Sequence, residues 1–347
     1  MPVFGATIGC KKESLPISKV TIIGAGAGGL SAGYLLAQRG IDFEILEASS
    51  TYGGRMKINT DFADFPIPLG SEWIETGLGI FDEIVNDGSV SVDFQTIPDL
   101  PDRKFVNYSW FQFFEDYVVP SVLPKIQFNT VVSSVDYQND QVTVTTQTGQ
   151  HTADRVVISV PLKILQDGVI SFTPELPQNK RNAINDARVW DGFKAFFEFT
   201  EAFYDTQEFP VSPTTDGQKW FYDASLGQNS NKNILGIFTV GTPATEYNSR
   251  SGNDLRDFIL AELDALYGGQ ATQKYVNHIV QNWNDEPFIQ GGYLSDHADW
   301  NKVARLGQSV DNKVYFAGGP YTDGEDWVSV HAAARSARMT IDEMTGQ

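Results

Sequence analysis

The feature that most constrains the fold is a glycine-rich turn between a short apolar run and a stretch with helical spacing. Residues 19–23 (KVTII) are largely β-branched and lead directly into the run 24–29 (GAGAGG). Residues 30–37 are apolar at helical spacing, and the apolar run 41–46 then ends at Glu47. This order predicts a βαβ unit of about 30 residues, the context in which a GxGxxG pattern indicates a dinucleotide site.

The glycines of this turn have separate roles in such a unit. Gly24 permits the tight turn, Gly26 lets the backbone approach a diphosphate, and Gly29 lets the helix pack closely on the strand. The N-terminus of the helix offers free N–H groups and partial positive charge to phosphates. Glu47 stands where a carboxylate accepts hydrogen bonds from a ribose diol, and it would repel the 2′-phosphate of NADP.

The rest of the chain alternates between further strands and helices. Residues 131–137 and 141–146 alternate apolar with polar side chains around a turn at 139–140, which predicts an antiparallel pair. We also expect buried strands at 155–160 and 313–317, a strand rich in aromatic residues at 190–199, and a final helix over 329–344.

Composition excludes several classes of protein. The chain has 347 residues, with 25 Lys and Arg against 44 Asp and Glu, a formal net charge of −19 that argues against a nucleic-acid surface. No apolar run approaches the roughly 20 residues of a membrane-spanning helix. Four scattered histidines and one cysteine predict neither a metal site nor an internal disulfide.

Residues 1–17 differ in composition from the first strand and its glycine turn, and they are interpreted as a tail or as the remnant of a signal segment. The sequence 7–10 (TIGC) is similar to a bacterial lipoprotein cleavage box, in which Cys10 would carry a lipid tether. The two interpretations predict different locations, the bacterial cytoplasm for a plain tail and the periplasm or a membrane anchor for a lipid-modified Cys10.

Beyond Glu47 the sequence resembles the flavin-dependent amine oxidase family. The run 47–55 (EASSTYGGR) resembles the family's acid-Ala and Gly-Gly-Arg fingerprint, and 69–74 (LGSEWI) resembles its Gly-x-x-Trp-Ile loop. The segments 130–132, 161–177 and 314–318 match later motifs in order. The resemblance implies non-covalent FAD, because the only cysteine, Cys10, precedes the first strand.

The resemblance also assigns residues to the cofactor. Arg55 would meet the diphosphate, which suits the two-pronged geometry of a guanidinium, and the backbone of Val132 would hold the adenine. The helix that starts near Ser329 would direct its N-terminus at the flavin. The full set of implied cofactor-binding residues is Gly24, Gly26, Gly28, Gly29, Glu47, Ala48, Gly54, Arg55, Gly70, Ser71, Glu72, Trp73, Val132, Gly318, Gly319, Trp327, Val328 and Val330.

Two residues are implied for the chemistry. Lys194 falls where many family members carry a lysine that reaches flavin N5 through a water, and Tyr293 occupies the first of two aromatic positions that flank a substrate amine. A lysine among aromatic residues is costly to bury unless its ammonium finds a partner or its pKa falls. The alternative for Lys194 is a lysine on an edge strand that points to solvent.

The sequence departs from the family pattern at two places. Val330 stands near the second aromatic position, where Trp327 or His331 could substitute. Gly319 replaces the acid that usually follows Phe-Ala-Gly, so Asp323 or Glu325 would have to supply that contact to the ribityl chain.

The resemblance implies an α/β fold, with a Rossmann-like FAD-binding domain and an interleaved α+β substrate domain on a mixed or antiparallel sheet. We assign 18–77, 125–172 and 308–347 to the first domain, and 78–124 and 173–307 to the second. The segment 78–124 is shorter than the helical subdomain of larger members. Its aromatic run 108–117 would form either a wall of the substrate cavity or, the interpretation we favour, plain core.

The expected function is that of an FAD-dependent oxidoreductase acting on a small molecule, an amine, by hydride transfer to flavin N5, with reoxidation by O₂ or another acceptor. One alternative is an FAD-dependent desaturase or oxidase of C–C bonds in a polyene or porphyrinogen, which the missing second aromatic residue favours. Another is a non-catalytic FAD-binding protein, which the short segment 78–124 and Gly319 would suit.

Overall fold

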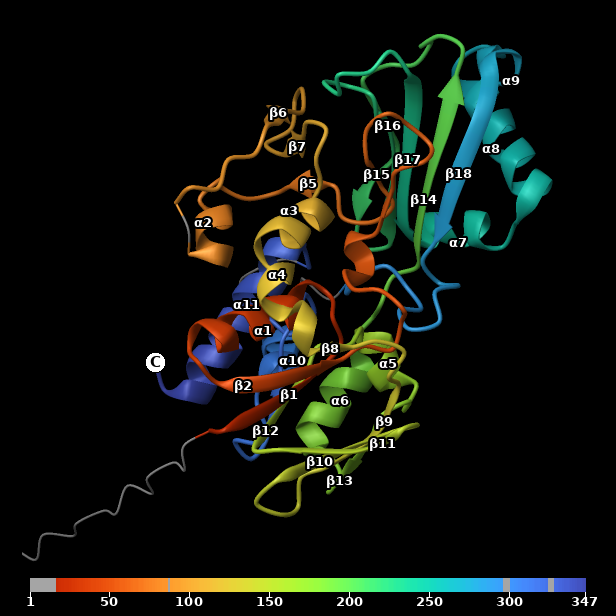
Figure 1. Ribbon diagram of the computed structural model, residues 1–347. Coiled ribbons are helices and arrows are strands. Elements are labelled where there is room, and N and C mark those ends of the chain that lie inside the picture. The colour runs from red at the N-terminus through yellow and green to blue at the C-terminus, as the bar shows by residue number, and fades with distance from the viewer. Residues whose placement is uncertain (1–16, 87, 296–299, 324–327) are drawn as a thin grey trace, which may run out of the picture.

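A five-stranded parallel sheet organises one half of the molecule. The computed structural model describes residues 17–86, 88–295, 300–323 and 328–347. The strand order is β19 (Val314–Phe316), β12 (Arg155–Ile158), β1 (Lys19–Ile23), β2 (Asp42–Leu46) and β8 (Ile126–Gln127), and every neighbouring pair is parallel (Figure 1). The predicted βαβ unit is confirmed, with α1 (Ala27–Gln38) between β1 and β2.

One face of this sheet is covered by helices from both ends of the chain. The first helix, α1, packs against α11 (Val330–Thr345), and one continuous apolar core joins them to the sheet. Three helices from the middle of the chain contribute to the same core: α2 (Ile80–Val85), α3 (Trp110–Tyr117) and α4 (Val119–Val122). The aromatic run 108–117 therefore supplies core, as we favoured, although Phe111 and Glu115 also reach the cavity described below.

The other face carries a second core. A four-stranded sheet has the order β11 (Gly149–Ala153), β10 (Val142–Thr146), β9 (Val132–Asp136) and β13 (Ser171–Thr173). The strand β10 alternates buried and half-buried residues, because one face of the sheet packs on the protein. The helices α5 (Leu162–Gln166), α6 (Gln178–Asp186) and α10 (Trp300–Gly307) complete this side, with contacts between α5 and α6 and between α6 and α10.

The second half of the molecule is built on an antiparallel sheet. Its order is β15 (Gln207–Thr214), β16 (Gly217–Asp223), β17 (Asn233–Gly241), β14 (Gly192–Phe199) and β18 (Tyr275–Asn282). Beside the sheet lie α7 (Thr242–Asn248), α8 (Gly252–Leu266) and α9 (Gln270–Lys274), whose side chains form a core with one face of it. Since β14 lies between β17 and β18, it is an inner strand, which rules out the edge-strand alternative for Lys194.

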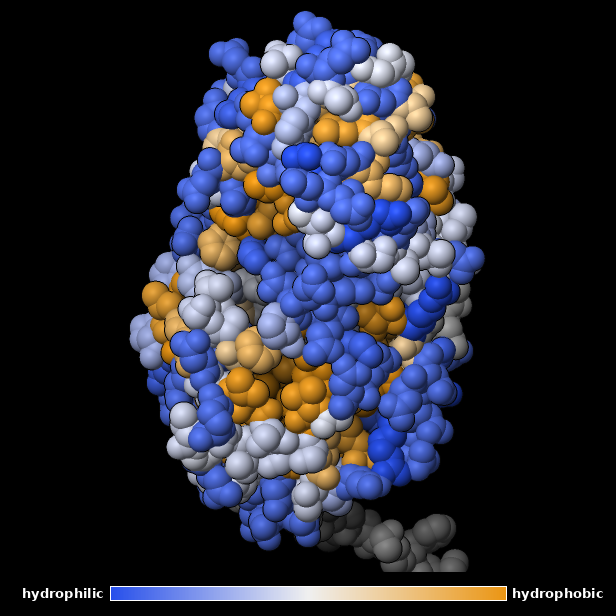
Figure 2. Space-filling model, turned by 90° about the vertical axis from the view of Figure 1, so that its right-hand side faces the viewer, coloured by the Kyte–Doolittle hydropathy of each residue, from blue (hydrophilic) through white to orange (hydrophobic). Residues whose placement is uncertain are grey.

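Short elements connect the two halves. The three-stranded sheet of β5 (Trp73–Ile74), β7 (Arg103–Phe105) and β6 (Phe94–Thr96) lies near the antiparallel sheet. The remaining short elements are β3 (Ile58–Asn59), β4 (Ile67–Pro68), η1 (Gly54–Met56) and η2 (Leu123–Lys125). The space-filling view shows apolar side chains gathered in a recess that hydrophilic residues border (Figure 2).

The fold class expected from the sequence is confirmed. The domain boundaries remain a prediction, and the packing of α2–α4 on α1 and α11 shows that segment 78–124 shares a core with the parallel sheet. The expectations for Cys10, Trp327 and Glu325 lie outside the described residues. No helix within the described ranges is long and apolar enough to cross a membrane.

Candidate functional site

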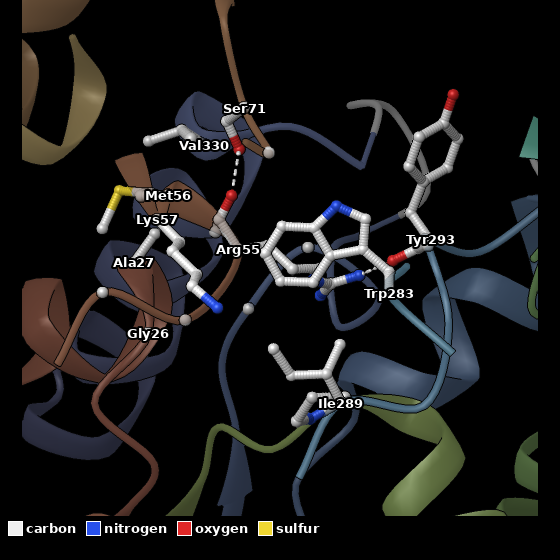
Figure 3. Close-up of a pocket in the computed structure, with 18 of the residues that line it drawn as sticks. Gly26, Ala27, Arg55, Met56, Lys57, Ser71, Trp283, Ile289, Tyr293 and Val330 are labelled. Atoms are coloured by element: carbon white, nitrogen blue, oxygen red, sulfur yellow. Dashed lines mark hydrogen bonds between the residues drawn. The ribbon is translucent and has the colours of Figure 1, made fainter. Parts of the chain in front are cut away.

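A cavity of about 1020 Å³ lies between the parallel sheet and the antiparallel sheet. Its lining brings together most of the residues that the sequence assigned to a cofactor, from Gly24 at the end of β1 to Val330 at the start of α11. Both residues proposed for the chemistry, Lys194 and Tyr293, line the same cavity. Segments far apart in the sequence therefore meet here, as Figure 3 shows for Gly26, Arg55, Trp283 and Tyr293.

The glycine turn has the geometry that a phosphate-binding loop needs. Gly24 has φ = +102°, and a Cβ atom there would lie 2.6 Å from the carbonyl oxygen of Ser159. A Cβ on Gly29 would lie 1.9 Å from the carbonyl oxygen of Gly24, so this glycine sets how closely α1 packs on β1. Gly29 itself does not line the cavity, and its role is structural.

Gly26 differs from these two residues because its missing side chain faces open space. A Cβ there would meet no atom within 4 Å, and Gly26 lines the cavity. It is also the N-cap of α1, and no side chain caps the helix there. Free backbone donors at the end of a helix are suited to phosphate oxygens.

Glu47 is held at the end of β2 by the turn itself. Its carboxylate accepts hydrogen bonds from the backbone N–H of Ala25 (2.6 Å) and from the N–H and hydroxyl of Ser49 (2.8 and 2.7 Å). These contacts fix an acid at the cavity wall beside the helix N-terminus. The arrangement suits a ribose diol, in line with the sequence prediction.

Arg55 places a positive charge in the cavity. Its guanidinium donates to the carbonyl oxygen of Gly292, and no carboxylate among the described residues forms an ion pair with it. Burial lowers the pKa of Arg55, with the nearby Tyr321 opposing this effect. Gly70 supports the arginine backbone, since a Cβ there would lie 1.8 Å from the carbonyl oxygen of Arg55. A cation held in this way and facing a cavity fits an anionic ligand such as a diphosphate.

A charge cluster of Glu72, Lys104, Lys194 and Tyr222 lies behind the far wall of the cavity. Lys194 Nζ is 2.6 Å from Glu72 Oε2, and it also donates to the carbonyl oxygens of Pro68 (2.9 Å) and Gly70 (3.1 Å). Both side chains of this pair are about 2 % exposed or less. The buried ammonium thus has a carboxylate partner, which is one of the two solutions expected from the sequence.

The second oxygen of the same carboxylate faces a second lysine. Lys104 Nζ lies 3.3 Å from Glu72 Oε1, within ion-pair distance but without hydrogen-bond geometry, and Tyr222 Oη donates to Glu72 Oε2 at 2.6 Å. Burial acts to raise the pKa of Glu72, but Lys194 and Lys104 outweigh it, so the pKa is lowered and the carboxylate is ionised. Glu72, predicted to bind the cofactor, thus directs its carboxylate to the two lysines.

Four aromatic side chains form an aromatic wall on the same side of the cavity: Trp73, Phe209, Trp220 and Phe238. The rings of Trp73 and Trp220 stack with centroids 4.5 Å apart, and Phe209 stacks on Trp220 at 5.2 Å. Phe238 meets the edge of Trp73 at 5.4 Å. This wall offers flat apolar surface to a ligand.

Tyr293 lies on the loop that returns from β18. Its ring centroid is 5.7 Å from that of Trp190, and its backbone carbonyl oxygen accepts a hydrogen bond from the backbone N–H of Trp190. Burial raises the pKa of the phenol, with Glu75 adding to the shift, so the group stays protonated at neutral pH. Of the residues considered for the two departures from the family pattern, His331 and Asp323 are described, and neither is among the residues that line the cavity.

Trp283 is a cavity residue that sequence reasoning missed. Its indole N–H donates to the carbonyl oxygen of Leu69 at 3.1 Å, and the ring lies beside Arg55 in Figure 3. The sequence held one indication of this role. Trp283 is an isolated tryptophan shortly before Pro287-Phe288, in a segment where only Tyr293 matched the family pattern. Lys104 was missed as well, since it stands next to Arg103 in a polar stretch with no pattern.

Comparisons with known proteins agree with this geometry. Residues 122–344 match the family model for flavin containing amine oxidoreductase, and residues 22–85 match the model for an NAD(P)-binding Rossmann-like domain. Polyamine oxidase 4 of Oryza sativa subsp. japonica is 31% identical over 225 residues, which cover 63% of this chain and 45% of that protein. Lysine-specific histone demethylase 1B of Mus musculus is 26% identical over 201 residues, 56% of this chain and 24% of that protein.

The chain thus spans less than half the length of these two relatives. Among solved structures, a triple mutant of putrescine oxidase superposes with a TM-score of 0.78 at 15% identity, covering 95% of this chain and 99% of that one, which establishes the common fold. FAD is the cofactor that the matched family and the cavity support, and the described part of the chain offers no cysteine to link it covalently. The chain belongs to the flavin-containing amine oxidoreductase family.

Proposed function

We propose that the protein is an FAD-dependent oxidase or dehydrogenase of an amine. The observation that carries the proposal is one cavity with two unlike walls, a dinucleotide wall (Gly24, Gly26, Glu47, Arg55 and Gly318) and the aromatic wall. When bound, FAD supplies an acceptor at N5 for a hydride from the carbon that bears nitrogen, which leaves an imine.

The residues of the dinucleotide wall fit this cofactor. Arg55 has its positive charge at the cavity without a carboxylate partner among the described residues, Gly26 leaves room for a diphosphate, and Glu47 presents an acid to a ribose. A site built for a neutral ligand would leave the arginine uncompensated, which is costly in a buried position.

Lys194 and Tyr293 would act beside the substrate. All three N–H groups of the Lys194 ammonium have acceptors, so in this arrangement the residue contributes positive charge and no lone pair for proton abstraction. The protonated Tyr293 would offer the face and edge of its aromatic ring as a contact surface for the substrate amine. An amine that binds in its neutral form needs no protein base for the hydride transfer, and the aromatic wall would exclude water from it.

The direct test is the visible spectrum of the purified holoprotein during anaerobic addition of primary, secondary and polyamines. Bleaching of the flavin bands by one class of amine is the expected result and would define the substrate class. Val330, at the position of the second aromatic residue, favours a different substrate, so the same titration includes a porphyrinogen and a polyene. Bleaching by one of these alone would replace amine oxidation with C–C oxidation. A flavin that none of them reduces would indicate a protein that binds FAD without turnover.

A further inference from the structure

The charge cluster contains a lysine that never reaches the cavity. Lys104 is 6 % exposed and is not among the lining residues, whereas its neighbours Glu72 and Lys194 are. Its ammonium donates to the carbonyl oxygen of Ala224 and lies 3.3 Å from Glu72 Oε1. Lys104 and Lys194 therefore share one carboxylate from opposite sides.

Through its direct contacts this cluster holds two positive charges against one negative charge, and Asp223 interacts with the charge of Lys104 at longer range. Two ammonium groups and one carboxylate are buried together, and Tyr222 adds a hydrogen bond but no charge. Solvent screens such charges little because the four side chains are almost completely buried. Lys194 brings its part of this charge to the cavity wall, because it lines the cavity and its ammonium lies 4.9 Å from the centroid of the Trp73 ring.

The cluster joins three parts of the fold. Glu72 lies just before β5, Lys104 lies on β7 opposite Trp73, and Lys194 and Tyr222 lie on β14 and β16 of the antiparallel sheet. Replacing Lys104 would therefore change the charge behind the cavity without changing a cavity contact.

We propose that Lys104 is a positioning residue that, through the shared Glu72, sets the positive charge that Lys194 presents to the flavin. This inference rests on the proposed function only for the placement of FAD in the cavity. The two ammonium groups are coupled electrostatically: burial lowers the pKa of Lys194, Glu72 opposes this effect, and the charge of Lys104 lowers the pKa further. A positive charge beside the flavin stabilises the negative charge of its reduced form.

The test is the reduction potential of the FAD-loaded protein, measured against reference dyes, for wild type and Lys104→Met. Methionine keeps a similar length and removes the charge. We expect the ratio of oxidised to reduced flavin at a fixed potential to rise by up to about tenfold, because one partly screened positive charge is removed from behind the cavity. The affinity for sulfite, which adds to electron-poor flavins, should fall in the same direction.

Two further variants separate this role from a structural one. Lys104→Arg restores the charge and should return the potential toward the wild-type value. Arg39→Met removes a positive charge that pairs with Asp342 and does not line the cavity, and it should leave the potential unchanged.

A folded, FAD-loaded Lys104→Met protein with the wild-type potential and sulfite affinity would overturn the proposal. Glu72→Gln provides an independent check with the opposite sign, since loss of the negative charge should make the flavin easier to reduce. None of these measurements needs an amine. Failure of the amine titration would therefore contradict the proposed function alone, and an unchanged potential would contradict the role of Lys104 alone.

Discussion

The two walls of the cavity are made in different ways. The dinucleotide wall depends on backbone: its glycines lie where a Cβ would collide with a carbonyl oxygen, as at Gly24, or would enter the cavity, as at Gly26. The aromatic wall depends on side chains, with stacked rings in front and the charge cluster behind. The first wall therefore tolerates almost no change of shape, whereas the second can be altered one interaction at a time.

The largest predicted effect separates two glycines of the same turn. Gly29→Ala places a methyl group 1.9 Å from the carbonyl oxygen of Gly24, so α1 must move off β1, and we expect the FAD-free protein to lose about 3 kcal/mol of unfolding free energy. Gly26→Ala meets nothing within 4 Å and should change that free energy by less than about 0.5 kcal/mol, while it weakens FAD binding. Urea unfolding and FAD titration measure the two quantities. Equal destabilisation by both substitutions would contradict the assignment of Gly26 to the ligand.

Arg55 tests whether the dinucleotide wall depends on charge as well as on shape. Arg55→Met should weaken FAD binding by about ten- to a hundredfold, the contribution of one or two hydrogen bonds to a charged group. Arg39→Met is the matched control, because Arg39 pairs with Asp342 and does not line the cavity. Calorimetric titration of the FAD-free proteins gives the affinities. An Arg55→Met protein with wild-type affinity would exclude the diphosphate contact.

Each half of the molecule buries a lysine, and the two should respond differently to pH. Lys194 has a carboxylate partner, whereas Lys180 donates to backbone carbonyl oxygens, and burial lowers the pKa of Lys180 to about 6. Between pH 6 and the ordinary lysine value near 10.5, the unfolded chain therefore holds a proton that the folded protein lacks. Stability should rise with pH in this window, by up to about 1.4 kcal/mol per pH unit.

Urea unfolding of wild type and Lys180→Met at pH 6, 7 and 8 checks this prediction. The difference between the two proteins should grow in favour of wild type as the pH rises, because the variant lacks the titrating group. A difference that is independent of pH would show that Lys180 keeps its proton in the folded state.

The smallest predicted effect concerns the aromatic wall. Trp220→Leu removes the ring between Trp73 and Phe209, and we expect the KM for the amine to rise less than tenfold, with FAD affinity unchanged, since one stacked pair contributes about 1 kcal/mol. Phe221→Leu is the control, because the adjacent side chain belongs to the core on the opposite face of the sheet. Steady-state kinetics distinguish the two. A KM that rises equally in both variants would indicate a loss of sheet structure and no direct contact with substrate.

The dinucleotide wall could be predicted from the sequence because its determinants are local. The spacing of Gly24, Gly26 and Gly29, and an acid at the end of the next strand, suffice to specify the turn, and the first strand has the predicted limits Lys19–Ile23. The strand with Lys194 was also expected, although it begins at Gly192 and not at 190.

The charge cluster could not be predicted in the same way. The aromatic strand indicated that Lys194 needs a partner, but Glu72 is 122 residues away in the sequence and Lys104 carries no recognisable pattern. Whether Glu72 and Lys104 lie next to Lys194 depends on how the three-stranded sheet packs against the antiparallel sheet. The sequence of a single strand does not specify that packing. The same holds for Trp283, whose hydrogen bond to Leu69 spans 214 residues.

The packing of α11 on α1 has a consequence for synthesis. The βαβ unit is translated before residues 314–345, which supply the helix that covers α1 and the strand β19 at the edge of the parallel sheet. Until those residues have been translated, the apolar face of α1 lacks its cover and Gly28 lacks Gly318, whose Cα would lie 2.8 Å from a Cβ at that position. We therefore expect the cofactor site to be completed late in synthesis, and the apolar surface of the unfinished N-terminal half to favour aggregation in the interval.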